Sequence, residues 1–146
     1  MFYAESKTDP QVYLVFDVES LGLYGSAYAW AGTLLVNGEE VRTYRCAVDP
    51  ARMRLNSVDE SGLAWAEQHS LPHIRKWDSD LVSDGKLGFG EVARHFNYHW
   101  SLVVREFPEA YLVADCCFPV ETNFLSQAVR NGTPVYPLLD VSTLLL

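Results

Sequence analysis

The sequence has few cysteines, few basic residues and no long apolar run. Its three cysteines are Cys46, Cys116 and Cys117, and they contain no C-x-x-C pair. An odd count with two adjacent cysteines does not form a disulfide framework, so we expect buried, reduced thiols in a cytoplasmic protein. No stretch of about 18 or more apolar residues is present, so the sequence predicts no membrane-spanning segment.

Positive charge is scarce. Eleven Lys and Arg residues against 19 Asp and Glu residues give a net charge of −8. Sequence-independent binding of duplex nucleic acid needs many contacts between basic side chains and phosphates, so this composition disfavours it. An enzyme that holds a few nucleotides through bound metal ions remains compatible, because the metal ions reverse the local sign of charge.

Apolar residues are plentiful and predict one globular domain. They make up 49% of the 146 residues, and 13% of the chain is aromatic. Residues 1–10 lack an apolar signal core, so we expect a loose N-terminal lead-in there. The domain is then assigned to residues 11–146.

The first half of this domain has the pattern of three strands. Residues 12–16 are an unbroken apolar run, which predicts a strand buried on both faces. Residues 27–36 predict a second strand, and the alternating residues 40–48 predict a half-exposed third one. Asn37-Gly38 between them is a strong hairpin signal, so we expect a three-stranded antiparallel meander.

The middle of the chain has one weak and one clear helical pattern. Ser57-Val58-Asp59-Glu60 could cap a helix that continues to Gln68, and residues 72–86 are expected to be irregular. Residues 88–107 predict an amphipathic helix that ends before Pro108. Its histidines lie off the apolar stripe, so we interpret them as solvated residues without a functional role, namely His95 and His99.

The last part alternates strand and helix. Residues 110–115 predict a short buried strand that ends in a carboxylate. A helix from Pro119 should bury Phe124, Leu125, Ala128 and Val129 and stop at Asn131-Gly132. Residues 135–140 predict a final strand, and Asp140 should cap a helix that begins at Val141. This order predicts the α/β class, a mixed sheet with helices packed on it.

Two carboxylates stand at the end of the first predicted strand. Asp17 and Glu19 are two residues apart, so they share one face of the strand and lie roughly 6–7 Å apart along it. They would repel each other unless a cation lay between them, and carboxylate oxygens suit Mg²⁺ or Mn²⁺. A motif this short is a weak signal, so the alternative to a metal site is that Asp17 and Glu19 are two solvated carboxylates in a loop.

Residues 17–23, Asp-Val-Glu-Ser-Leu-Gly-Leu, resemble the first motif of the DEDD 3′–5′ exonucleases of the ribonuclease H-like superfamily, D-x-E-[T/S]-x-G-L. Gly22 would permit a tight turn and a close approach of the backbone to a nucleotide. The resemblance implies a ribonuclease H-like mixed sheet in which three antiparallel strands are followed by parallel strands. It extends from Val12 onward, with strong identity in the first motif and the strand that follows.

A second motif of the family is matched less well. It places an Asp after the fourth strand as D-x-x-F-[L/M], which resembles residues 115–125. Counting back from Phe124-Leu125 puts the carboxylate on Glu121, whereas the strand end puts it on Asp115. We expect Asp115 to be the metal ligand in preference to Glu121, which could instead only complement the helix dipole.

The resemblance implies a metal-dependent nuclease that removes nucleotides from the 3′ end of single-stranded DNA or RNA with two Mg²⁺ or Mn²⁺ ions. Asp17 would bridge both ions, Glu19 would hold one, and Asp115 or Glu121 would reach the other. The substrate would be contacted by residues of the first motif, with the leucines against the terminal base. These residues are Ser20, Leu21, Gly22 and Leu23.

The family's last motif, H-x-x-x-x-D or Y-x-x-x-D, supplies a general base and has no counterpart after Asp140. We therefore expect a domain that is incomplete at its C-terminus and shows weak or no turnover. One alternative is a catalytically impaired ribonuclease H-like module that binds nucleic acid or a protein partner. Another is a structural α/β domain with a fortuitous D-x-E. The sequence does not choose between RNA and DNA, or between a monomer and a homo-oligomer.

Overall fold

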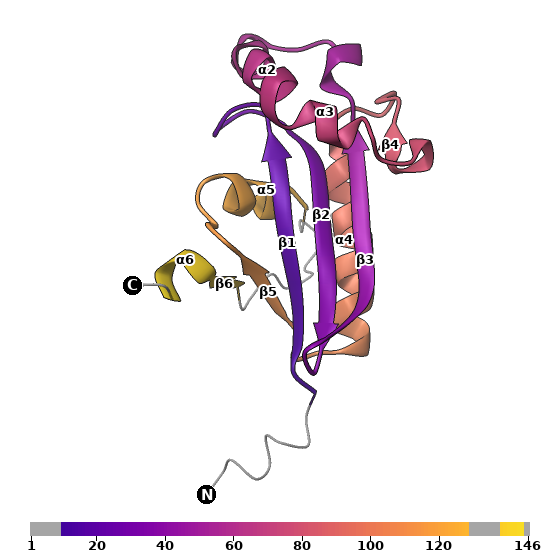
Figure 1. Cartoon of the computed structure of the whole chain (residues 1–146), viewed down its shortest axis with the longest axis vertical. Coiled ribbons are helices and arrows are strands. Elements are labelled where there is room, and N and C mark those ends of the chain that lie inside the picture. Colours follow the sequence, from indigo (N-terminus) through magenta and orange to yellow (C-terminus); the bar gives the residue numbers. More distant parts are fainter. Residues whose placement is uncertain (1–9, 129–137, 145–146) are drawn as a thin grey trace, which may run out of the picture.

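The computed structural model describes residues 10–128 and 138–144. Within them, one mixed sheet has the strand order β4-β3-β2-β1-β5-β6 (Figure 1). The strands are β1 (Val12–Ser20), β2 (Ala27–Val36), β3 (Glu39–Val48), β4 (Val82–Ser83), β5 (Tyr111–Ala114) and β6 (Leu138–Asp140). The helices are η1 (Pro50–Arg52), α2 (Ser57–His69), α3 (Leu71–Ile74), η2 (Ser79–Leu81), α4 (Gly90–Glu106), α5 (Val120–Ala128) and α6 (Val141–Leu144).

The sheet combines the two pairings that the sequence predicts. β1, β2 and β3 pair in antiparallel fashion, whereas β5 joins β1 and β6 joins β5 in parallel. The β2–β3 hairpin turns at Asn37 and Gly38, whose φ angles are 53° and 82°. This left-handed pair of residues matches the twist of the strands that it joins, which confirms the predicted hairpin.

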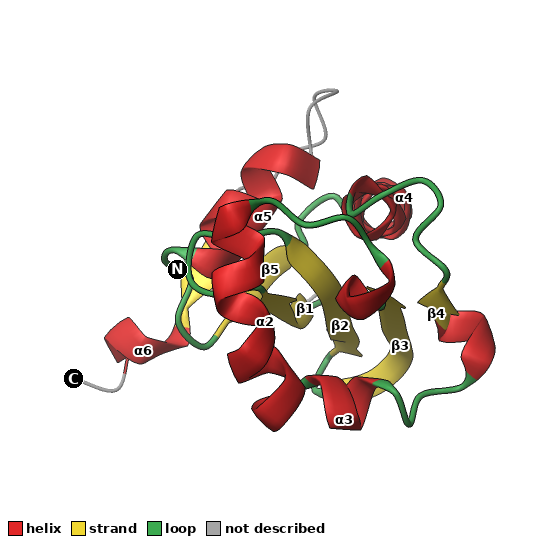
Figure 2. Ribbon diagram, turned by 90° about the horizontal axis from the view of Figure 1, so that it is seen from above, coloured by secondary structure: helices red, strands yellow, loops and turns green. Residues whose placement is uncertain are grey.

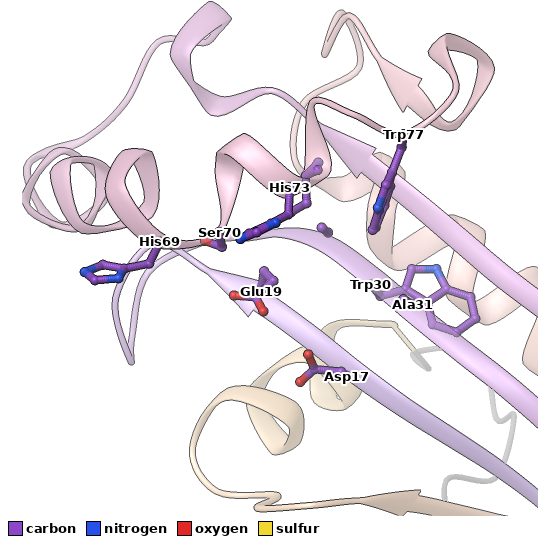
Figure 3. A pocket seen from close by; sticks show the side chains of 10 residues that line it. Asp17, Glu19, Trp30, Ala31, His69, Ser70, His73 and Trp77 are labelled. Atoms are coloured by element: carbon purple, nitrogen blue, oxygen red, sulfur yellow. The ribbon is translucent and has the colours of Figure 1, made fainter.

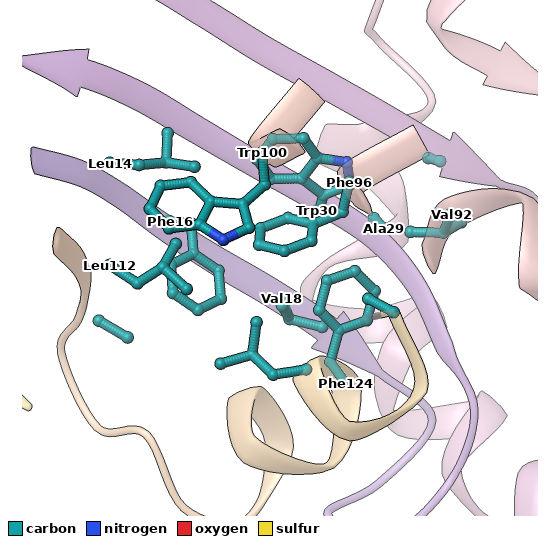
Figure 4. Close-up of a cluster of buried hydrophobic side chains, with 14 of the residues drawn as sticks. Leu14, Phe16, Val18, Ala29, Trp30, Val92, Phe96, Trp100, Leu112 and Phe124 are labelled. Atoms are coloured by element: carbon teal, nitrogen blue, oxygen red, sulfur yellow. The ribbon is translucent and has the colours of Figure 1, made fainter. Parts of the chain in front are cut away.

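One face of the sheet is covered by α4 and α5, and α2 and α3 lie on the other side (Figure 2). The covered face holds an aromatic core, drawn in Figure 4. The rings of Trp30 and Phe96 meet edge to face at 4.9 Å, and Phe96 meets Phe124 in the same way at 5.2 Å. Such edge contacts add to the free energy that burial of the rings provides.

β1 alternates in burial, which corrects the expectation that both of its faces are buried. Val12, Leu14, Phe16 and Val18 face the core, whereas Val15 and Asp17 are exposed on the opposite face. The apolar composition of β1 predicts that both faces are buried. The helices α2 and α3 reach over only one end of the second face, so the rest of that face stays exposed. The open face is therefore where the site can form.

The segment between β3 and α4 is more ordered than the sequence predicts. It contains α3, η2 and β4, the last of which pairs in parallel with the end of β3. Asn56, and not Ser57, is the N-cap of α2, and its Oδ1 accepts a hydrogen bond from Asp59 N at 2.8 Å. The lead-in, the helix stop at Asn131-Gly132, Val129 and residues 135–137 of the last predicted strand lie outside the described residues.

The two histidines of α4 are half-buried and not fully solvated, which is a second correction. His95 Nδ1 accepts a hydrogen bond of 3.0 Å from Trp30 Nε1, and the His99 ring lies 5.2 Å from that of Tyr44. Burial lowers the pKa of His95 to about 4 and also lowers that of His99. Both therefore belong to the packed side of the sheet as neutral rings.

The cysteines are free thiols, as expected, but they are not all buried. Cys117 is buried and Cys46 is half-buried, whereas Cys116 is exposed. Burial raises the pKa of Cys46 and of Cys117 to about 11 in each case. In the described part of the chain, no helix has both the length and the apolar character needed to span a membrane.

Candidate active site

Asp17 and Glu19 project from β1 onto the open face, as the spacing of two residues predicts. Their neighbours on β2 are Ala31 and Ala29, whose small side chains leave space above the sheet. Burial raises the pKa of Glu19, and the negative charge of Asp17 raises it further. The two carboxylates are therefore electrostatically coupled, which is the repulsion that the sequence leads one to expect.

Glu121 reaches the same place from the first turn of α5. β5 pairs with β1 only along Tyr13–Val15, so the edge of β1 beyond that point has no strand partner. Glu121 Oε2 accepts a hydrogen bond of 3.1 Å from Val18 N on this edge. The side chain brings its carboxyl group against β1, and the residue is only 6% exposed.

The environment of Glu121 favours its protonated form. The pKa of Glu121 is raised to about 7, mainly by burial and also by Asp17 through its charge and a side-chain hydrogen bond. The hydrogen bond from Val18 N acts in the opposite direction. Asp17 thus interacts with Glu19 on its own strand and with Glu121 on α5.

Asp115 follows directly after β5 and is exposed. The parallel pairing of β5 with β1 ends at Val15 and Val113, and Asp17 and Asp115, two residues further along each chain segment, line one hollow of about 580 Å³. The next turn is tied to the end of β6, since Asp140 Oδ2 accepts a hydrogen bond from Cys117 N at 3.2 Å. Asp140 Oδ1 accepts one from Ser142 N at 3.0 Å, which confirms that Asp140 caps α6.

The turn after β1 presents only part of the expected substrate-binding set. Gly22 has a φ of 78°, so a left-handed residue is required where the motif has glycine. Ser20 Oγ donates a 2.6 Å hydrogen bond to Gly22 O within the turn. Leu23 is 61% exposed and available for contact, whereas Leu21 is 1% exposed and packs in the core, so its side chain is not open to a base.

Helices α2 and α3 form a wall above the carboxylates that the sequence analysis missed. A cleft of about 220 Å³ is lined by Asp17, Glu19, His69, Ser70, His73 and Trp77, among others (Figure 3). The His73 imidazole extends into the space above Glu19, and that of His69 points away from it. The sequence signal for this wall was the four-residue spacing of His69 and His73. His95 and His99 have the same spacing but do not lie near the site.

The wall is attached to the turn after β1 by direct contacts. Asp59, buried in α2, accepts hydrogen bonds from Ser26 N at 2.7 Å and from Ser26 Oγ at 2.8 Å. Gly62 lies so near this turn that an added Cβ would be 2.3 Å from the carbonyl carbon of Leu21. The buried acceptor and the close approach together hold α2 over the end of β1.

The donor chemistry of the site fits a hard divalent cation, although the ligands are not assembled around one. Among residues 10–128 and 138–144, no group of three or more His, Cys, Asp or Glu side chains is arranged to hold a metal ion. The carboxylates occur as coupled pairs, Asp17 with Glu19 and Asp17 with Glu121. The ion pairs found in these residues involve other acids, so a bound cation would relieve the repulsion between the carboxylates.

Comparison with known proteins adds no identification, since no family, no curated protein and no solved structure matches the chain. The fold and the site define an α/β domain with a carboxylate cluster at the carboxyl end of β1.

Proposed function

We propose that this chain is a metal-dependent 3′–5′ exonuclease domain of the ribonuclease H-like type, acting on single-stranded nucleic acid. The observation that carries the proposal is that Asp17 and Glu19 project from the end of a central strand while Glu121 binds the edge of the same strand at Val18 N. Acidic groups from separate elements meet there next to an open hollow, as phosphodiester hydrolysis with metal ions requires. The mixed sheet, with three antiparallel strands before the parallel ones, is compatible with this type of fold.

In this proposal Asp17, Glu19 and Glu121 hold the metal ions. Glu121 takes precedence over Asp115, reversing the preference from sequence, because Glu121 interacts with Asp17 while Asp115 is exposed beyond it. Bound Mg²⁺ or Mn²⁺ would supply an activated water and neutralise charge on the phosphate. Without it, the same three carboxylates repel one another.

His73 is the group that we assign to proton transfer. Of the four histidines, His69 and His73 line the cleft with the carboxylates, and only the His73 imidazole extends over Glu19. Attack of water on the phosphorus forms a new P–O bond and breaks the bond to the 3′ oxygen. The proton of the water passes to the imidazole, and the leaving 3′ oxygen takes a proton from solvent.

Titration of the protein with Mn²⁺ by calorimetry tests the proposal, together with release of mononucleotides from a 3′-labelled single strand. We expect Mn²⁺ binding that Asp17→Asn abolishes, and loss of any Mn²⁺-dependent release in the same variant. Asp80→Asn, an identical change at an exposed position in η2, is the matched control. Wild-type Mn²⁺ binding and release in Asp17→Asn would contradict the role of this carboxylate.

A second candidate is a ribonuclease H-like module that binds nucleic acid without cleaving it. In that case the chain would bind single strands equally well with Mn²⁺ and with a chelator. Asp17→Asn would leave the dissociation constant unchanged, and no mononucleotide would be released.

A further inference from the structure

Three hollows on the open face of the sheet are joined by the carboxylates. The first is lined by Glu19, Leu23 and Trp65, the second is the cleft beneath α3, and the third spreads over β1–β3 as far as Arg45. Glu19 lines both the first and the second, and Asp17 lines both the second and the third. The three hollows therefore adjoin one another along β1, and we call them together the trough, with the proposed hydrolytic site in its middle.

The two ends of the trough differ in chemistry. The Trp65 end, of about 400 Å³, is enclosed by the turn after β1, by α2 and by Val120 of α5. Its apolar side chains are left open to solvent, since Trp65 is 57% exposed and Leu23 is 61% exposed. An accessible indole face next to an aliphatic side chain suits a nucleobase, because every base has a π-face.

The Arg45 end is an open groove with a small-residue floor. Asp17 pairs with Ala31, and Ala31 pairs with Arg45, so these residues lie in one row across the sheet face. Adjacent strands are about 4.8 Å apart, which puts Arg45 about 10 Å from the strand of Asp17. The Arg45 guanidinium lies 5.3 Å from the centre of the Trp77 ring. Glu40 and Asp115 line the same groove, so Arg45 is the group there whose charge suits a phosphate.

We propose that the trough binds the 3′ end of a single strand with a fixed polarity. The terminal base stacks on Trp65, the scissile phosphate lies at Asp17 and Glu19, and the upstream phosphates run toward Arg45. This assignment rests on the proposed function and adds to it the two residues that select and orient the strand. The 3′-terminal nucleotide then lies between α2 and α5, and the rest of the strand runs over β1–β3.

Binding of single strands with phosphorothioate 3′ linkages, measured by fluorescence anisotropy with Mn²⁺ present, tests the polarity. Trp65→Ala should weaken binding about tenfold, as loss of one stacked base does. A strand whose 3′-terminal nucleotide is abasic should bind the wild type more weakly by the same factor, and Trp65→Ala should not weaken it further. The control is Tyr98→Ala, which removes an exposed aromatic side chain on α4, across the sheet.

Arg45→Ala should weaken binding of a decanucleotide but not of a dinucleotide, because Arg45 contacts only upstream phosphates. The slope of log K against log salt should be smaller in magnitude for Arg45→Ala than for the wild type, by about 0.7. Arg105→Ala on α4 is the control. Wild-type affinity in both Trp65→Ala and Arg45→Ala would overturn the proposal. Sensitivity of Trp65→Ala to the 5′-terminal base, and not to the 3′-terminal one, would also overturn it.

The two proposals fail separately in these experiments. If Asp17→Asn abolishes Mn²⁺-dependent release while Trp65→Ala and Arg45→Ala bind as the wild type does, the trough is wrong and the nuclease assignment stands. If the strand binds with the expected polarity but no variant or condition shows Mn²⁺-dependent release, the nuclease assignment is wrong and the trough stands.

Discussion

The two faces of the sheet are built from the same strands and have opposite properties. On the covered face, β1 contributes Phe16 and Val18 to an aromatic core under α4 and α5. On the open face the same strand contributes Asp17 and Glu19, next to the small side chains of Ala29 and Ala31. The alternation of a strand thus separates residues that stabilise the fold from residues that can do chemistry.

This separation has an energetic consequence. The covered face gains free energy from burial of apolar side chains, whereas the open face holds coupled carboxylates whose mutual repulsion costs free energy. Changes on the covered face should therefore lower stability and leave ligand binding intact. Changes on the open face should affect binding or catalysis and leave stability unchanged, or even raise it.

The largest expected effect is on the covered face. Phe96 is completely buried and touches Trp30 and Phe124, so Phe96→Ala leaves a large cavity. We expect a loss of about 3–5 kcal/mol in the free energy of unfolding, measured by denaturant titration. Mn²⁺ affinity of the fraction that stays folded should be unchanged. A loss of less than about 1 kcal/mol would mean that the two faces do not differ as described.

The next effect is on the wall above the open face. His73→Ala should reduce Mn²⁺-dependent release of mononucleotides about 100-fold through kcat, because the proton acceptor is lost. Mn²⁺ affinity and thermal stability should not change, since His73 is exposed and makes no core contact. His99→Ala, on α4 across the sheet, is the matched control. Equal losses in the two variants would show that His73 has no special role.

A smaller effect should follow where the wall meets β1. Gly62→Ala places a Cβ against the backbone of Leu21, so α2 must shift, at a cost of about 1–3 kcal/mol in unfolding free energy. Gly90→Ala, in the first turn of α4, meets only the flexible end of Arg94 and should be close to neutral. If Gly62→Ala is also neutral, α2 does not lie against this turn.

The smallest effect is the pH dependence that Glu121 introduces. Its pKa is raised from 4.5 to about 7, so the protonated form stabilises the fold below 4.5 and this contribution is lost as pH rises to about 7. The melting temperature of the wild type should therefore fall over this range relative to that of Glu121→Gln. Mn²⁺ affinity should rise over the same range, because binding requires the carboxylate. Parallel melting curves of the two proteins at every pH would contradict the coupling.

Local patterns predicted the elements that local physics decides. Residues 27–36 form the second strand with the predicted bounds, Asn37-Gly38 forms the hairpin, and α4 follows its apolar repeat. The side-by-side placement of Asp17 and Glu19 also follows from strand geometry alone. These outcomes depend on neighbours within a few residues, so the sequence contains the necessary information.

Long-range contacts decided what local patterns could not. β4 is two residues long and exists only because the end of β3 offers an edge for it to join. His95 is half-buried because Trp30, 65 residues away, donates a hydrogen bond to it. Glu121 can bind Val18 N because β5 stops pairing with β1 before that point, which no motif near Glu121 encodes.

By itself, the sequence determined that two carboxylates end a central strand on one face, because alternation along a strand is a property of the backbone. Only the tertiary structure decided what stands around them. It brought Glu121 against Asp17 and set His73 and Trp77 above the sheet. Packing of α2, α3 and α5 against β1 made those choices, since burial and backbone hydrogen bonds act between residues that are distant in the chain.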